Sequence, residues 1–282
     1  MGAIYRGDIP YSGGGSGSAE LTSDLTASVT VGGVTAGKKF NKGDSLETVV
    51  RNILSPTLYP TFTNPSASMS STGAKLIEKG GSLATTFTIS FNRGSINPAY
   101  GTSGYRSGVA TSYTLDGTTQ ASNTFSITVT EAKTSYQGSV AYAQGEQPKD
   151  SNGQDYSTPL PAGSVNTGTI NYEFVDALWA NTSNIATVAK LSLVSKSTKQ
   201  RDMVFPAQTV ANPEIFDVPA SWTVTAVQVK NDLSGQYEDA IDQFSVTDVT
   251  HDDASGTSTA YKRYTFNMGM ATGSRSVRLK WS

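Results

Sequence analysis

The chain has a single histidine, His251, which is followed by two carboxylates in the sequence His251-Asp252-Asp253. A Ser-His-Asp triad would need this imidazole as its base. No Gly-x-Ser-x-Gly nucleophile elbow accompanies it. We therefore expect His251 to be a solvated loop residue without a catalytic role. A closed zinc site is also disfavoured, because it needs several His or Cys ligands and the chain has no cysteine.

A second oxygen-rich segment runs from Asp150 through Asn152 to Asp155, with Gly153 between them. Calcium loops of the EF-hand type use such residues, but they place Gly at the sixth position and Glu at the twelfth. Here Asp155 and Pro161 stand at those positions. Asx and Gly residues also form plain turns. We therefore predict a turn at this segment, with a calcium site as the alternative.

Aromatic side chains are the third group that could bind a ligand. Tyr100 and Tyr105 fall in a Gly-rich stretch, residues 92–108, and could stack on sugar rings. Loops of this kind carry binding sites more often than strands do. Trp222 and Trp281 lie in alternating segments, which predicts that they pack in a core or an interface.

The elements that must position these residues are mostly strands. Leu83–Phe91 alternates apolar and polar residues, the period of a half-buried strand. The same period recurs around Phe125–Val129 and Ile170–Phe174. Further strands are predicted at 188–194, 222–229, 244–249, 261–266 and 277–281. Polar, Gly-rich loops are predicted at 92–108 and 144–163. The fold class is therefore all-β, with immunoglobulin-like sandwich modules that lack the usual cysteine pair.

One helix is predicted after a short strand pair that turns at Gly32-Gly33. Asp44 and Glu47 have the spacing of a capping box, and Ser55-Pro56 ends the helix. The apolar residues form one stripe for packing within the chain or between copies of it: Leu46, Val49, Val50, Ile53 and Leu54.

Four parts follow from these signals: an arm at 1–20, the strand pair and helix at 21–56, a β domain at 57–182 and a C-terminal β domain at 183–282. The arm carries a Gly/Ser run after Ile4, Tyr5, Ile9 and Tyr11. Such an apolar tip on a flexible tether is typical of a docking segment, and a frayed end is the alternative.

Composition excludes several classes of function. The net charge is −2 and charged residues make up 16% of the chain without a basic block, so nucleic-acid binding is not expected. No apolar run approaches the length of a membrane span, and the first residues lack the apolar core of a signal peptide. We expect no cofactor, no enzymatic activity and synthesis in a cytoplasm.

Two stretches resemble known proteins. Residues 31–40, continuing through Asn41-Lys42-Gly43-Asp44 into the helix that ends at Pro56, resemble a segment of fibre and decoration proteins of gut bacteriophages. Residues 218–227, 261–264 and 277–281 are similar to the terminal modules of those proteins. The resemblance covers about a third of the chain and implies a virion structural protein, either a head fibre or decoration protein or a tail-associated component.

That resemblance implies partners as well. They are other virion proteins, further copies of the chain in a homo-oligomer (with a trimer favoured), and host or mucus glycans. It implies assembly in the host cytoplasm and location on the virion. A carbohydrate-binding adhesin module remains the alternative function, with Tyr100 and Tyr105 as glycan contacts.

Overall fold

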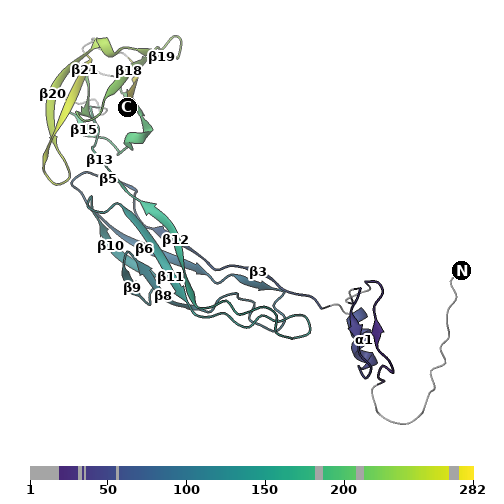
Figure 1. Cartoon of the computed structure of the whole chain (residues 1–282). Coiled ribbons are helices and arrows are strands. Elements are labelled where there is room, and N and C mark those ends of the chain that lie inside the picture. Colours follow the sequence, from purple (N-terminus) through teal and green to yellow (C-terminus); the bar gives the residue numbers. More distant parts are fainter. Residues whose placement is uncertain are drawn as a thin grey trace. The chain divides into compact units, whose positions relative to one another are not determined.

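The computed structural model describes residues 19–30, 34, 36–54, 57–181, 187–207, 213–266 and 273–282 (Figure 1). Strands and several sheets dominate these residues, with one α-helix, so the predicted all-β class is confirmed at this level. The docking residues Ile4, Tyr5, Ile9 and Tyr11 and the Gly32-Gly33 turn lie outside the described residues.

The chain divides into two compact units whose boundaries differ from the expected ones. The first contains Met1–Asn64, Arg93–Gly108 and Gln144–Ala162. The second contains Pro65–Asn92, Val109–Ala143 and Gly163–Ser282. The two long loops predicted for the central β domain therefore belong to the same unit as the N-terminal residues.

The N-terminal module, residues 19–54, is a strand pair followed by the predicted helix. Its elements are β1 (Leu25–Thr26), β2 (Lys39–Phe40) and α1 (Leu46–Leu54). β1 and β2 are antiparallel, with Leu25 opposite Phe40. Ahead of the helix, Leu46 N–H donates to the carbonyl of Ala19 (2.7 Å), which ties the start of the module to the start of α1.

The two side chains of the expected capping box have other partners. Asp44 Oδ2 accepts the backbone N–H of Asn41 at 2.7 Å, so this carboxylate closes the turn before the helix. Glu47 forms an ion pair with Arg51 one turn further along α1 (2.7 Å), the i,i+4 spacing that stabilises helices. Asp44 therefore orders the approach to the helix, and Glu47 stabilises the helix itself.

Two antiparallel sheets form the central β module. One has the order β10-β6-β4 and the other the order β12-β11-β8-β9. The strands of this part of the chain are β4 (Ser66–Ser71), β5 (Leu76–Glu78), β6 (Leu83–Asn92), β8 (Ala110–Leu115), β9 (Thr118–Gln120), β10 (Thr124–Val129), β11 (Ser135–Tyr142), β12 (Gly163–Asn171) and β13 (Glu173–Val175).

Both sheets of the central module contribute to one core. Phe87 and Ile89 from β6 are fully buried, and they share the core with Leu115 from β8 and Val140 from β11. The alternation of the sequence puts these residues on the inner faces, as predicted for β6. Gly138 of β11 lies against Ile89 so closely that a Cβ there would meet Ile89 Cδ1 at 2.6 Å. The two sheets are therefore in close contact at this point.

Two short strands of the central module, one early and one late in its sequence, form a parallel pair. β5 pairs with β13, with Leu76 opposite Glu173 and Glu78 opposite Val175. The hydrogen bonds continue beyond the strands, because Lys79 N–H donates to the carbonyl of Val175 (3.0 Å). The Lys79 ammonium also contacts the buried carboxylate of Asp176 at 2.6 Å.

The C-terminal β module has a five-stranded sheet, β15-β14-β17-β21-β20, and a four-stranded sheet, β16-β22-β18-β19. Its elements are β14 (Trp179–Ala180), β15 (Ala189–Lys190), η1 (Lys196–Thr198), β16 (Gln200–Phe205), β17 (Glu214–Pro219), β18 (Val224–Lys230), β19 (Tyr237–Asp239), η2 (Ile241–Gln243), β20 (Phe244–Asp252), β21 (Ser258–Phe266) and β22 (Arg275–Trp281).

The core of this module confirms the prediction for two of the tryptophans. Trp222 and Trp281 are buried with their ring centroids 4.8 Å apart, and Trp281 Nε1 donates to the carbonyl of Lys196 (2.8 Å). The strand expected at 188–194 is shorter than predicted, since only Ala189–Lys190 pairs with a neighbour. β20 is longer than predicted and extends through His251.

Candidate functional site

Three loop segments of the first unit form one ordered cluster, which we call the loop platform: residues 57–64, 93–108 and 144–162. It contains a short antiparallel pair of β3 (Thr61–Thr63) and β7 (Ser95–Asn97), with Phe62 opposite Ile96. The sequence predicted the second and third segments as loops. Their mutual packing gives the platform a defined structure.

Close backbone contacts hold the segments together. Gly145 lies so near the main chain of Arg106 that a Cβ would stand 2.1 Å from its carbonyl oxygen, and only glycine fits there. Gly145 N–H donates to the carbonyl of Leu160 at 2.8 Å. Ser151 N–H donates to the carbonyl of Leu58 at 2.9 Å, which brings in the third segment.

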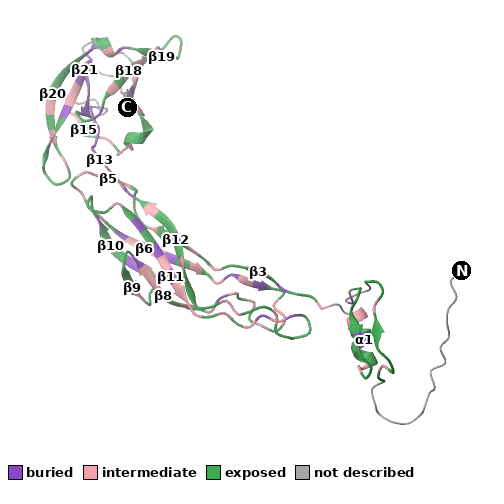
Figure 2. Ribbon diagram, viewed as in Figure 1, coloured by how far each residue is buried: buried purple, intermediate pink, exposed green. Residues whose placement is uncertain are grey.

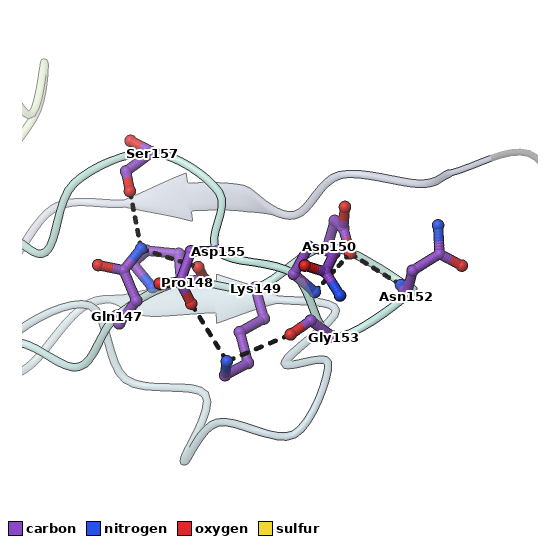
Figure 3. Close-up of polar contacts among 9 residues, drawn as sticks. Gln147, Pro148, Lys149, Asp150, Asn152, Gly153, Asp155 and Ser157 are labelled. Carbon is purple, nitrogen blue, oxygen red and sulfur yellow. Dashed lines mark hydrogen bonds and ion pairs between the residues drawn. The ribbon is translucent and has the colours of Figure 1, made fainter. Parts of the chain in front are cut away.

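The segment considered for calcium is a hydrogen-bonded turn (Figure 3). Asp150 Oδ1 accepts the backbone N–H groups of Asn152 (2.8 Å) and Gln154 (3.0 Å). The Lys149 ammonium contacts Asp155 Oδ1 and the carbonyl of Gly153, both at 3.2 Å. The Asp150 carboxylate is thus turned toward N–H donors, and a cationic side chain already neutralises Asp155. The geometry favours the turn interpretation.

A stack of aromatic rings and a guanidinium runs through the platform. The rings of Tyr59 and Tyr156 have centroids 4.6 Å apart, and Phe62 lies 6.3 Å from Tyr156 on a nearly parallel plane. The Arg106 guanidinium covers the Phe62 ring at 4.2 Å. Its Nε is buried and has no hydrogen-bond partner within the described part of the chain. Tyr59 is more than half exposed, so the stack ends in a ring open to solvent.

Of the two tyrosines expected to contact a glycan, Tyr105 is exposed and Tyr100 is only partly so. The Arg93 guanidinium lies over the Tyr105 ring at 4.1 Å and donates from Nε to the carbonyl of Ser107 (3.0 Å). The N–H of Ser103 donates to Glu146 Oε2 at 2.8 Å. This hydrogen bond, assisted by the charge of Arg93, lowers the pKa of Glu146.

The apolar stripe of α1 is divided between two environments. Val49 is buried against Val34 and Phe40, and Ile53 packs beside them. Leu46, Val50 and Leu54 remain exposed. The stripe predicted from the sequence is therefore wider than the surface that the module itself covers.

The interpretation of His251 as a solvated loop residue is wrong. It lies in β20 with its side chain 13% exposed, and its Nε2–H donates to Asp217 Oδ2 at 2.6 Å. Trp179 stacks on the imidazole (centroids 4.2 Å apart, planes 9° apart), and Tyr261 meets it edge-on. Arg263 occupies both oxygens of Asp217. The imidazole is thus packed against two aromatic rings, and the carboxylate that it contacts also binds Arg263.

No group of three metal-ligating His, Cys, Asp or Glu side chains occurs in the described ranges. None of the helices in these ranges has the length and apolar character to span a bilayer. No protein-family model matches the chain, and no significant similarity to a curated protein or to a solved structure is found.

Proposed function

We propose that the chain is a structural component of a bacteriophage particle, a head-fibre, decoration or tail-associated protein that acts without catalysis. It docks by its N-terminal region and displays its β modules outward. The resemblance of residues 31–56 and of the C-terminal segments to such proteins supports this proposal. The observation that carries it is the N-terminal module, which exposes an apolar helix face instead of completing a core.

The β modules fit this role. Each has two antiparallel sheets around one core, and we propose that both are immunoglobulin-like. The hydrogen-bonded pair of His251 and Asp217, the one arrangement in the described residues that resembles part of a triad, is covered by Trp179 and Tyr261. A display role needs stable modules and no reaction centre.

The test is the location of the chain. Purified particles from infected cells should contain it in a fixed copy number by quantitative mass spectrometry, and labelled antibody should decorate the particle surface in electron micrographs. Deletion of residues 1–18, which keeps the Ala19 carbonyl that binds Leu46 N–H, should leave the protein folded but absent from particles. Recovery of the full-length chain only in the soluble fraction of the lysate would contradict the proposal.

Glycan binding at the loop platform is the second candidate. The exposed end of the Tyr59–Tyr156 stack and the Arg93–Tyr105 pair support it, because sugars bind to aromatic faces beside charged donors. Tyr59→Ala and Tyr105→Ala should each reduce binding to mucin glycans. Tyr237→Ala is the matched control, since Arg278 lies over its ring at 3.9 Å in the C-terminal module. Equal binding by all three variants would remove this candidate.

A further inference from the structure

The described part of the N-terminal module buries few residues. Among the described residues of 19–54, the core consists of Val34, Phe40 and Val49, with Leu21, Ala27 and Ile53 packed partly against them. Modules below ~40 residues generally need a disulfide, a metal or association with another chain for stability. The chain has no cysteine, and the described residues offer no metal cluster. Further stability must then come from contacts with another surface, either that of the loop platform in the same unit or that of another chain.

The exposed side of α1 supplies the surface for association. Leu46, Val50 and Leu54 recur every four residues, so they form one row along the helix, and they are 45%, 41% and 74% exposed. Figure 2 shows α1 as largely exposed. In the strand pair, Leu25 lies directly opposite Phe40 and is a further exposed apolar side chain of the module. It is 48% exposed.

The charges of the module favour another copy of the same chain as the occupant. Glu20, Asp24, Asp44 and Glu47 balance Lys38, Lys39, Lys42 and Arg51, so residues 19–54 are electrically neutral. The two charged residues of α1, Glu47 and Arg51, already neutralise each other at 2.7 Å. Identical modules can therefore approach without repulsion. A partner selected by charge would need a surplus of one sign, which this surface lacks.

We propose that α1 is a self-association helix, with Leu46, Val50 and Leu54 of each copy packed against the same residues of its neighbours around a symmetry axis. Val49 and Ile53 hold the helix on its own strand pair. This proposal explains why the apolar stripe is divided: one half packs in the core of its own module, and the other half packs against neighbouring copies. The proposal rests on the proposed function in that it assigns a partner to the same N-terminal region.

The test uses the absence of cysteine from the chain. In the proposed packing, position 50 lies close to the symmetry axis and therefore beside position 50 of a neighbouring copy, so full-length Val50→Cys should form an intermolecular disulfide under mild oxidation. Thr48→Cys is the control, because position 48 is exposed and faces away from position 50 by about 160° on a helix of 3.6 residues per turn. Crosslinked product should be several-fold greater for Val50→Cys.

Light scattering on the full chain provides the second measurement. The unchanged protein should have a mass of at least two chains of 29.7 kDa each. Leu54→Glu should weaken association by roughly tenfold or more, whereas Thr48→Glu should leave it unchanged. A monomeric unchanged protein, or equal crosslinking at positions 48 and 50, would overturn the proposal. A monomer that still enters particles would refute self-association alone, and an oligomer that never enters particles would refute the particle role alone.

Discussion

The carboxylate of Asp217 is the most informative position for testing how the C-terminal module is held together. It is fully buried. It accepts three hydrogen bonds, two from the guanidinium of Arg263 and one from the imidazole of His251. Arg263 donates from Nε (2.8 Å) and Nη2 (2.7 Å), and His251 donates from Nε2 (2.6 Å). The hydrogen bonds to Asp217 raise the pKa of Arg263, so the guanidinium stays charged. Asp217→Asn keeps the shape of the side chain and removes its charge.

The size of the effect follows from this geometry. The amide oxygen of Asn can replace Oδ2 and keep two donors, but its NH₂ group then faces the Nε–H of Arg263, donor against donor. One hydrogen bond worth about 1.5–3 kcal/mol is lost, and the other two lose their ionic character. Removal of one partner from a buried ion pair costs about 3–5 kcal/mol. Because Arg263 is partly exposed, we expect a loss near the lower end, about 3 kcal/mol.

Tryptophan fluorescence during urea unfolding is a suitable assay. The three tryptophans, Trp179, Trp222 and Trp281, all belong to the C-terminal module, so their signal follows the unfolding of that module. Asp202→Asn is the matched control. Asp202 also binds an arginine fork, that of Arg278 at 2.8 Å for both contacts, but on the exposed surface, where ion pairs contribute little.

We expect a much larger drop in the free energy of unfolding for Asp217→Asn than for Asp202→Asn. Equal losses of unfolding free energy in the two variants would show that burial does not determine how strongly an ion pair stabilises this module. That result would refute the role assigned to Asp217.

Three further outcomes are expected. Gly138→Ala should cost about 1–3 kcal/mol through its clash with Ile89, and Ile89→Val should recover part of this in the double variant; Gly168→Ala, with nothing within 4 Å of its Cβ, is the control in urea melts. Burial raises the pKa of Glu214, so the folded protein holds this proton more tightly than the unfolded chain, and the free energy of unfolding falls as pH rises above the ordinary pKa of ~4.3. The difference in unfolding free energy between the unchanged protein and Glu214→Gln should therefore be most in favour of the unchanged protein at acidic pH and should shrink toward neutral pH. A difference that grows with pH would contradict this expectation. Burial raises the pKa of Tyr261 to about 12, so stability should be lost as pH rises from ~10 toward 12 and less so in Tyr261→Phe, as measured by alkaline unfolding curves.

The sequence predicted those elements whose residues carry a strong period. Leu83–Phe91 alternates large apolar and small polar residues, and it is β6. The stripe on α1 was equally clear. β4, Ser66–Ser71, was missed because its residues are mostly serine, with only Ala67 and Met69 facing the core. In such a strand the pairing with β6 supplies the structure, and no local pattern reveals it.

The sites were harder to predict, because they depend on strand register and chain folding. His251 and Asp217 are 34 positions apart and meet only because β17 and β20 both pair with β21. Tyr59 and Tyr156 come together through packing of separate loops. One signal for the loop packing was available: Gly145, in a segment read as a simple loop, is a position where another backbone approaches closely.

The parallel pair of β5 and β13 gives the central module a mechanical property. Once β4, which is paired with β6, passes on the load, a pull on the two ends of the chain draws β5 toward its N-terminal side and β13 toward its C-terminal side. In a parallel pair these forces run along the strands in opposite directions, so the hydrogen bonds between Leu76–Glu78 and Glu173–Val175 carry the load together and not one after another. Single-molecule stretching should therefore show a distinct force peak for this module, and Ile77→Pro, which removes an N–H and distorts the short strand, should lower it. A module loaded this way resists extension by shear.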